Sequence, residues 1–543
     1  MKVKLKMANK QCLTIKKSYI CSELWSFYLA SAAKKARKNQ KPIRLIICNM
    51  EKYDIFRNID FGDIDGLYDK NLNEYFIDND YWNQLVEGRK FFVIGRKGTG
   101  KSAIYNWIKT KEAEKNVLVS NLSFKNFPFE KLLKLTDDDF QKPNQYQSVW
   151  RNIILSEIAK LIVLDERNQI DDDYLNIQNY VRIKFGNDLE DLHKRVTAQS
   201  RKTDTGLYIK GSGGGISSSE TTEYGDEMGN ITMINSILEH SIKNYLKRYQ
   251  TNHYIIQFDQ LDDNYTIYVT NDSYFQSIIS LFKVIYDLNQ SFYQIDVPVK
   301  VIGYLRSDIF YEINNYDAES ARWDSCKLYL NWSIINSSDW DYPQLLKLLD
   351  RRAIRSFPEL KEFKSPFREI FREVKIPRKG KTPANVFTYM IQRSFQRPRD
   401  LIQFCKKIQD DSSKWETLNE RNILDSEKAY SVWLLTEVSN EFGPLVRSKK
   451  LLYEFLRNFG DRKLSYDEVC DIYMKRYENE IGIKIDNLLD LLYRLGIIFN
   501  VNVMKRSAEY FSIIRNEQST FNRNMSICLH PGIMKGLHVY SIQ

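Results

Sequence analysis

The sequence has few of the side chains that hold structural metals and disulfides. Its 543 residues include five histidines and seven cysteines, and no two cysteines form a C-x-x-C pair. Cys528 and His530 are the one close Cys/His pair, whereas a structural zinc needs four ligands. The composition therefore predicts no metal site built from these residues. An odd number of scattered cysteines is typical of a reducing, intracellular compartment.

Long apolar segments are also missing. No apolar run reaches the roughly 18 residues that a membrane-spanning helix needs. Leu24–Ala33, the nearest candidate for a signal peptide, lacks a convincing cleavage site. We therefore expect a cytoplasmic protein that does not attach to a membrane. The hydrophobic fraction of 43%, with 34 Tyr and 29 Phe, is ample for packed cores, and the length predicts about two to four domains.

Positive charge is concentrated in two segments. The net charge is +10, yet residues 1–50 carry twelve Lys/Arg against one acid, Glu23, and residues 351–407 carry sixteen against five acids. The rest of the chain is therefore net acidic. Basic segments bind nucleic acid in many proteins and are also often merely solvated surface, so both roles stay open. Residues 1–50 are predicted to be a basic N-terminal extension, unless the start codon has been placed too far upstream.

One stretch has the spacing of a phosphate-binding loop. Residues 91–102 read FFVIGRKGTGKS. They contain the pattern G-x-x-x-x-G-K-[ST], which here consists of Gly95, Arg96, Lys97, Gly98, Thr99, Gly100, Lys101 and Ser102. Four apolar residues precede the pattern, as a buried parallel strand requires, and the helix-compatible run Ala103–Ile108 follows it. This context favours a nucleoside triphosphate site over a chance glycine turn.

Each residue type in this loop suits a triphosphate. Glycines let the backbone curl so that successive N–H groups face phosphate oxygens, helped by the positive end of the following helix. Lys101 would reach the β- and γ-phosphates, and the hydroxyl of Ser102 would bind magnesium. The predicted ligands are therefore ATP and Mg²⁺. The chain has no N-K-x-D segment, L-S-G-G-Q-like signature or D-E-A-D/H box, which disfavours a GTPase, a transporter-type ATPase and a common helicase.

A second stretch predicts the carboxylate partner of the magnesium. Residues 255–263 read IIQFDQLDD, an apolar strand that ends in Asp259. A P-loop enzyme needs an acid at the carboxyl edge of its sheet, and Asp259 is the candidate; the alternative is an N-capping Asp after a strand. Hydrolysis also needs a group that orients or deprotonates the attacking water. Gln260 stands where many ATPases have Glu, so that role is predicted for Asp262 or Asp263.

These two motifs resemble those of known ATPases. The ending D-x-L-D-D resembles the Walker B motif of STAND and related AAA-type ATPases, whose typical form is D-G-L-D-E. GRKGTGKS combined with FDQLDD also resembles bacterial P-loop ATPases of the FunZ type, over roughly residues 60–410. Two residues depart from the pattern: Gln260, where Gly or Asp is usual, and Asp263, where Glu is commoner. The second departure leaves the rate of ATP hydrolysis open.

The resemblance also implies residues that read the γ-phosphate. Arg306 follows an apolar strand and matches the polar sensor of such ATPases; the alternative is a salt bridge from Arg306 to Asp308. Residues 396–404, QRPRDLIQF, resemble the second sensor at a lid helix. Arg399 is the better candidate there and Arg397 is the reserve.

Three further arginines fit either of two roles. Arg351, Arg352 and Arg355 lie in a helical stretch of the basic segment. In a homo-oligomer they would act in trans as arginine fingers. Otherwise they would form a solvated basic face.

Strands that alternate with helices predict the fold. Helical runs separate buried strand-like runs at residues 91–94, 116–120, 253–259 and 297–305. This order predicts a three-layer α/β core of the AAA-like P-loop type, with a parallel, doubly wound sheet covered on both faces. The predicted domains are an extension at 1–50, an ATPase core at 51–340, a helical lid at 341–440 and a winged-helix domain at 441–543.

The winged-helix prediction depends on the order of elements near the C-terminus. Ser465 and Glu468 predict a capping box at a second helix, and a third helix is predicted at Lys484–Leu495. Strand-like runs follow at 497–504, 509–515 and 525–529. In a DNA major groove the third helix would present Lys484, Asp486, Asn487, Asp490 and Arg494. Two of these are acids that phosphates repel, and winged helices also contact proteins, so both kinds of partner stay open.

Together the motifs predict an ATP-binding and ATP-hydrolysing switch or motor that acts on nucleic acid or on a protein partner. The family resemblance points to bacterial anti-phage defence. One alternative is a DNA-loading ATPase that resembles origin initiators and binds DNA through Arg378, Lys379 and Lys381. The other is a scaffold that binds nucleotide with little turnover.

Overall fold

The computed structural model describes most of the chain after residue 51. The described residues are 52–113, 116–124, 144, 146–185, 224–249, 252–261, 272–313, 320–334, 340–378, 381–411, 417–442, 445–504, 508–516 and 518–539. The predicted extension at 1–50, the candidate water-orienting residues Asp262 and Asp263, and Lys379 lie outside them. No helix in the described ranges is long and apolar enough to span a bilayer.

A five-stranded sheet, in which all strand pairs are parallel, lies at the centre of the molecule. The strands are β1 (Phe92–Gly95), β2 (Val117–Ser123), β3 (His253–Asp259), β4 (Val299–Arg306) and β5 (Lys327–Tyr329). Their order is β2-β3-β4-β1-β5. The chain therefore leaves β1 toward one edge of the sheet and leaves β4 toward the other. Open α/β sheets bind ligands beyond the carboxyl ends of strands at such a change of direction.

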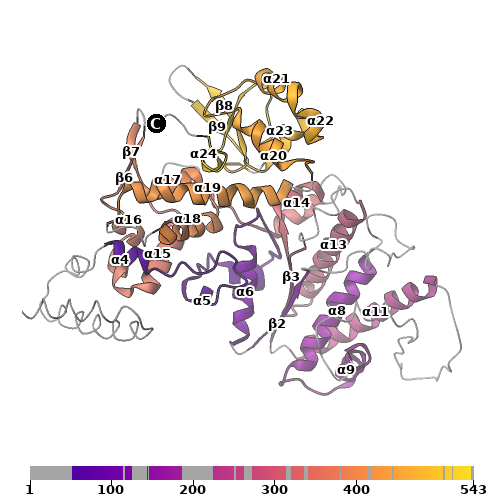
Figure 1. The fold of residues 1–543 in the computed structure, drawn as a ribbon. Coiled ribbons are helices and arrows are strands. Elements are labelled where there is room, and N and C mark those ends of the chain that lie inside the picture. Colours follow the sequence, from indigo (N-terminus) through magenta and orange to yellow (C-terminus); the bar gives the residue numbers. More distant parts are fainter. Residues whose placement is uncertain are drawn as a thin grey trace, which may run out of the picture.

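Helices cover both faces of this sheet (Figure 1). The core of one face includes α8 (Gln147–Leu164), α9 (Asp172–Phe185), α11 (Tyr224–Arg248), α13 (Asp272–Gln294), α14 (Ser307–Ile313) and η3 (Ser320–Cys326). The core of the other face includes α5 (Leu72–Tyr75), η1 (Asn83–Glu87) and α6 (Lys101–Thr110), with η2 (Lys111–Ala113) following α6. Side chains alternate between the faces along each strand: Phe92 and Ile94 belong to the first core and Val93 to the second. The predicted α/β class with a parallel sheet is confirmed, but the short strand β5 was not predicted.

From residue 340 the chain is mainly helical, as predicted. The helices are α15 (Gln344–Ser356), η5 (Pro358–Glu362), α16 (Pro366–Ile370), α17 (Val386–Arg393), α18 (Pro398–Asp411) and α19 (Glu420–Phe442). A hairpin of β6 (Lys375–Arg378) and β7 (Lys381–Asn385), which the sequence did not predict, interrupts them. The first described helix, α4 (Lys52–Arg57), packs in the core of this helical region rather than on the sheet. The domain boundaries stay a prediction.

The C-terminal unit contains the predicted helices and strands in the predicted order, together with two short helices that were not predicted. Its elements are α20 (Lys449–Arg457), α21 (Tyr466–Arg476), α22 (Glu478–Ile481), α23 (Ile485–Arg494), β8 (Ile498–Val503), β9 (Ala508–Phe511), β10 (Ser526–Leu529) and α24 (Pro531–Met534). The strands form an antiparallel sheet in the order β10-β8-β9. Ser465 and Glu468 form the predicted capping box at α21. This unit shares one hydrophobic core with the helical region, and α19 lies beneath it (Figure 1).

Candidate functional site

The loop between β1 and α6, residues 95–102, has the backbone geometry of a tight anion cradle; we call it the glycine-rich loop. Gly98 and Gly100 have φ angles of +81° and +98°, in the region that residues with a Cβ rarely adopt. At Gly95 a Cβ would lie 2.6 Å from Oγ1 of Thr99. Gly98 and Gly100 therefore need glycine because of their backbone angles, and Gly95 because a Cβ would meet the Thr99 side chain.

Lys101 lies inside the curve of this loop. Its side chain points back from the first turn of α6, where Nζ donates hydrogen bonds to the carbonyl oxygens of Gly95 (2.9 Å) and Arg96 (3.3 Å). The residue is only 8% exposed. Thr99 Oγ1 donates to the same Arg96 carbonyl at 2.8 Å, which closes the loop further. An ammonium group is thus held where the loop encloses space.

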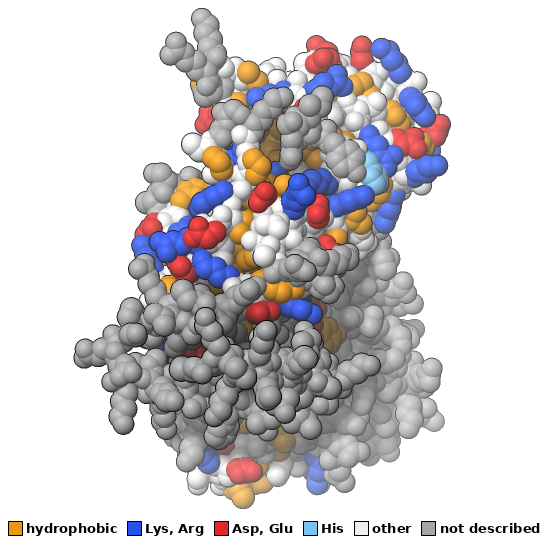
Figure 2. Space-filling view, turned by 60° about the vertical axis from the view of Figure 1, so that its left-hand side comes forward, with side chains coloured by type: hydrophobic (Ala, Val, Ile, Leu, Met, Phe, Trp, Pro, Cys, Tyr) orange, Lys and Arg blue, Asp and Glu red, His pale blue; other side chains and the backbone are white. Residues whose placement is uncertain are grey.

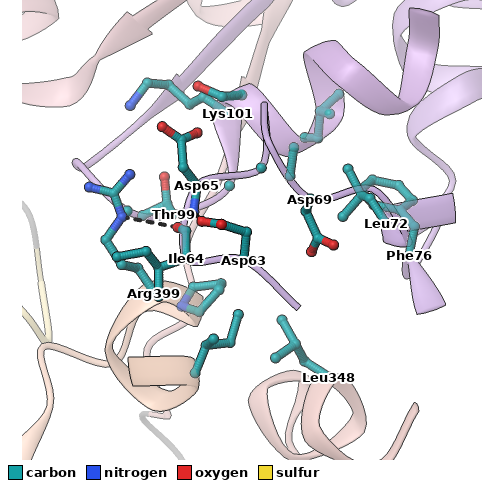
Figure 3. A pocket seen from close by; sticks show the side chains of 18 of the residues that line it. Asp63, Ile64, Asp65, Asp69, Leu72, Phe76, Thr99, Lys101, Leu348 and Arg399 are labelled. Carbon is teal, nitrogen blue, oxygen red and sulfur yellow. Dashed lines mark hydrogen bonds between the residues drawn. The ribbon is translucent and has the colours of Figure 1, made fainter. Parts of the chain in front are cut away.

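A cavity of about 340 Å³ opens in front of the loop (Figure 3). Its polar end is lined by Asp63, Asp65, Lys97, Gly98, Thr99, Gly100, Lys101, Ser102, Asp259 and Arg399. Asp259, the last residue of β3, is 2% exposed. The structure therefore brings the predicted magnesium-binding carboxylate to the same cavity as the loop, across an intervening strand. Within the described residues no cluster of three His, Cys, Asp or Glu side chains could hold a metal without further ligands.

The opposite end of the cavity is largely apolar, and the sequence did not predict it. It is lined by Leu72, Tyr75, Phe76, Ile77, Tyr81, Leu348 and Ile402, together with two charged residues, Asp69 and Arg352. Figure 3 shows Leu72 and Phe76 across the cavity from Arg399. The segment before β1, which reads as turn-rich in the sequence, therefore supplies much of this wall.

The three arginines of α15 lie at this end of the cavity, and Arg352 is part of its lining. Arg352 is buried; its Nε donates to the carbonyl of Phe61 at 3.0 Å, and its guanidinium lies 4.2 Å from the centre of the Tyr75 ring. Arg355 forms ion pairs with Asp60 (2.8 Å) and Glu74 (2.6 Å). Arg351 donates to the carbonyl of Phe76 at 2.5 Å. All three bind residues 60–77 of their own chain, so they act as an intramolecular clamp, which neither sequence alternative anticipated.

Arg306 lies at the end of β4, directly beside the start of the glycine-rich loop, because it pairs in register with Gly95. Its guanidinium forms ion pairs with Asp308 (2.5 Å) and with Glu441 (3.2 Å). Burial acts to raise the pKa of Asp308, but the charges of Arg306 and Lys101 outweigh it, so that the pKa is lowered. The salt bridge that the sequence offered as an alternative is present. Arg306 borders the loop without lining the cavity.

The two arginines at the start of α18 hold the loop in different ways. Arg399 lines the cavity; its backbone N–H donates to the carbonyl of Gly98 at 3.4 Å, and its side chain pairs with Glu437 at 2.8 Å. Arg397 is 3% exposed, donates to the carbonyl of Lys97 at 2.9 Å and pairs with Asp400 at 2.7 Å. The preferred sensor candidate therefore faces the cavity, while the reserve candidate clamps the loop from behind.

Two acids near the C-terminal end of α19 hold the cations of the site, and sequence reasoning missed them. Glu437 pairs with Lys97 (3.2 Å) as well as with Arg399, and Glu441 pairs with Arg306. Residues four apart lie on one face of a helix. Burial acts to raise the pKa of Glu437, but the neighbouring cations, Lys97 first, lower it overall. The acids are more than 100 residues from Arg306 in the chain, so only the helical spacing could have suggested that they act together.

Comparisons with known proteins cover parts of this architecture. Residues 343–439 match the family described as FunZ-associated C-terminal helical domain. This range contains α15 to α18 and most of α19. The putative transposon gamma-delta 80.3 kDa protein of Escherichia coli (strain K12) is 22% identical over 508 residues, which cover 88% of this chain and 67% of that protein. The FunZ resemblance is thus supported for the helical region, and no finding bears on the STAND resemblance.

Among solved structures, a chain in the structure of Drosophila ORC bound to DNA aligns with 85% of this chain and 93% of its own length, at 12% identity. The TM-score is 0.26. A similarity of this size carries no argument about fold or function.

Proposed function

We propose that this chain is a magnesium-dependent ATPase whose nucleotide state moves its helical region, and that it acts on nucleic acid. The observation that carries the proposal is one cavity that collects Lys101 and Ser102 of the glycine-rich loop, Asp259 from the end of β3 and Arg399 from α18. These groups come from three separate parts of the chain. Together they supply a cation, a hydroxyl, a carboxylate and a guanidinium, the set that phosphoryl transfer uses.

The polar end suits a triphosphate. Lys101 Nζ, which now donates to two loop carbonyls, would turn to the β- and γ-phosphates, and loop N–H groups would bind the remaining oxygens. Ser102 and Asp259 offer the hydroxyl and carboxylate oxygens that magnesium prefers. Magnesium held there would neutralise charge on the phosphates. Asp262 or Asp263, two and three residues after Gln260, stays the proposed group that orients water.

The apolar end suits a nucleobase. Apolar walls bind aromatic ligands by burying their surface, and polar groups such as Asp69 and Arg352 could orient the ligand. A base placed between Leu72, Phe76 and Leu348 would leave the phosphates at the glycine-rich loop. Arg352, fixed behind Tyr75, would keep this wall attached to α15. Nucleotide binding would therefore join the sheet to the helical region.

The acids of α19 provide a way to sense the γ-phosphate. A phosphate in the cavity would compete with Glu437 for the guanidinium of Arg399, because arginine pairs well with both anions. If the γ-phosphate also reached Arg306, which borders the loop outside the cavity, it would compete with Glu441 in the same way. Binding of ATP would then loosen α19, and loss of the γ-phosphate would restore the ion pairs. This proposal assigns sensor roles to Arg306 and Arg399.

Glu437→Gln tests this competition. We expect the substitution to tighten ATP binding by about 3- to 10-fold, because it removes a charge that competes with phosphate for Lys97 and Arg399. ADP affinity should change less. Isothermal titration of both nucleotides measures the difference. Asp425→Asn, which removes an exposed acid from the same helix, is the matched control; an equal rise in ADP and ATP affinity would contradict γ-phosphate sensing.

Nucleic acid is the proposed partner because the relative named above is described as a transposon protein. No comparison supports anti-phage defence, so we do not carry that role further. A scaffold with little turnover is the second candidate, since Asp263 replaces the commoner Glu.

The test of the function is ATP turnover by the wild-type chain with and without magnesium. Chelating magnesium should lower turnover by at least about 100-fold, because uncompensated phosphate charge raises the barrier. Single-stranded and duplex DNA are added separately as activators. Tight ATP binding with no turnover under any of these conditions would favour the scaffold.

A further inference from the structure

A second cavity, of about 510 Å³, lies between the helical region and the C-terminal strands; we call it the basic groove. Its walls come from the residues around α17, from the turn before α21 and from the sheet of β8, β9 and β10. Five cations line it: Arg378, Arg393, Arg462, Lys463 and Arg515. Asp461 is the single acid in its lining. Figure 2 shows Lys and Arg side chains interspersed with Asp and Glu in the upper half of one side of the molecule.

Four of these cations form no ion pair with a carboxylate of the described residues, although Arg462 lies close enough to Glu468 to interact with its charge. Arg393 pairs with Glu427 at 2.6 Å. In the described part of the chain, the others contact only carbonyls or a ring. Arg378 donates to Thr382 O (2.8 Å), Arg462 to Asn458 O (2.6 Å) and Arg515 to Tyr510 O (3.4 Å), while Lys463 Nζ lies 5.7 Å from the Tyr510 ring centre. The groove therefore carries net positive charge that an anionic ligand would neutralise.

Aromatic rings lie between these cations. Trp340, Phe499 and Tyr510 line the groove, and each is partly exposed. Exposed aromatic rings beside Lys and Arg are the combination by which proteins bind single-stranded nucleic acid, since bases stack on the rings and phosphates meet the cations. A cavity of this volume admits about one or two nucleotides of a strand passing through it. A duplex, whose bases are stacked and paired, would not reach the rings.

The helix α23, which was predicted to lie in a DNA major groove, is a poorer candidate for binding nucleic acid. Arg494, at the end of α23, forms ion pairs with Glu312 of α14 (2.8 Å) and with Asp490 (2.7 Å). Asp486 pairs with Arg523 at 2.9 Å. One end of α23 is therefore fixed to the sheet domain, and Arg494, the cation within Ile485–Arg494, is already paired with acids.

We propose that the basic groove binds single-stranded nucleic acid, with phosphates on Arg378, Arg462, Lys463 and Arg515 and a base stacked on Tyr510. This inference names the partner of the proposed ATPase. Strand binding itself does not depend on the proposed function, whereas the coupling of binding to ATP rests on it. The coupling runs through residues 394–399. Gln396 lines the groove, the adjacent Arg397 donates to Lys97 O, and the N–H of Arg399 donates to Gly98 O. A strand in the groove would thus press on the segment that holds the glycine-rich loop.

The test is fluorescence anisotropy of the full chain with labelled oligo(dT), oligo(rU) and a hairpin duplex of equal length. The triple variant R462A/K463A/R515A should bind the single strand at least about 10-fold more weakly. Its salt slope, log K against log salt, should be shallower by about 2, because three phosphate contacts are lost. Tyr510→Ala should weaken binding by about 5-fold or more, and Tyr510→Phe, which keeps the stacking surface, should restore it.

The matched control removes three cations elsewhere in the C-terminal unit, in the variant K475A/R476A/K484A. It should bind the single strand within about 2-fold of wild type. A control loss as large as that of the groove variant, or tighter binding of the hairpin duplex than of both single strands, would overturn the proposal. Comparing the affinities for oligo(dT) and oligo(rU) decides whether single-stranded DNA or RNA is preferred. ATP affinity is measured in every variant, so failure of the groove is distinguished from failure of the nucleotide site.

Discussion

Lys101→Ala is expected to weaken ATP binding by at least about 100-fold. Lys101 is the cation that projects from α6 into the curve of the glycine-rich loop, and it is nearly buried there. Charge-assisted hydrogen bonds contribute about 1.5–3 kcal/mol each, and the ammonium group is placed to bond two phosphates. Losing both therefore corresponds to about two or more powers of ten in affinity. Titration with a fluorescent ATP analogue and magnesium measures the loss.

Two further variants make the Lys101 result specific. Lys109→Ala removes an exposed lysine from the other end of the same helix and should leave ATP affinity unchanged. Asp259→Asn should keep ATP binding but lower turnover by about 100-fold, since a metal ligand is lost while the loop is intact. Wild-type affinity in Lys101→Ala, with an unchanged melting temperature, would contradict the nucleotide site itself.

The elements of the site that the sequence predicted are those with local signatures. The glycine-rich loop combines a buried strand, glycines at left-handed positions and the start of a helix within twelve residues. Asp259 was predicted because an apolar strand ends in it. Parallel strands bring their carboxyl ends to one edge, so the two motifs could be expected to meet although about 155 residues separate them.

The parts that the sequence did not predict depend on packing between distant segments. Nothing near Glu437 indicates that it pairs with Lys97, because the pair forms only when α19 lies against the loop. The apolar wall around Leu72 and Phe76 becomes a wall only because α15 faces it. β5 was missed because three residues are too few to show a period.

Arg96 is a single residue whose contacts with distant segments the sequence did not predict. The motif treats its position as variable, yet its guanidinium lies 5.7 Å from the centre of the Phe395 ring. A Cβ at Gly496, which follows α23, would lie 3.5 Å from Arg96 Nη2. The glycine-rich loop therefore touches the C-terminal unit directly. A residue that the phosphate pattern leaves free is used here for contact between distant parts of the chain.

Arg397→Ala and Arg399→Ala are expected to separate stability from turnover. Arg397 and Asp400 are 3% and 0% exposed, and together they form a buried ion pair. Removing the arginine leaves a buried carboxylate without its partner, which costs about 3–5 kcal/mol. Arg397→Ala should therefore melt well below wild type. ATP affinity should also fall in this variant, because the carbonyl oxygen of Lys97 loses its hydrogen-bond donor.

Arg399→Ala should show the opposite pattern. The partner of Arg399, Glu437, also pairs with Lys97, so removing Arg399 leaves this acid with a cation and should lower the melting temperature less than Arg397→Ala does. If Arg399 stabilises charge on the transferred phosphate, turnover should fall by about 100-fold at saturating ATP. Thermal melting and steady-state kinetics on the two variants give both quantities.

A third variant decides whether the Arg397 effect comes from the unpaired acid. Replacing both members by apolar residues of similar size, R397M/D400L, removes the buried charge along with its partner, and such swaps are often neutral or stabilising. The double variant should therefore recover most of the lost stability, while the loop clamp stays absent and ATP affinity stays low. Recovery of both properties would mean that Arg397 affects nucleotide binding only through folding. Recovery of stability alone would show that the hydrogen bond to Lys97 O holds the glycine-rich loop in the form that binds ATP.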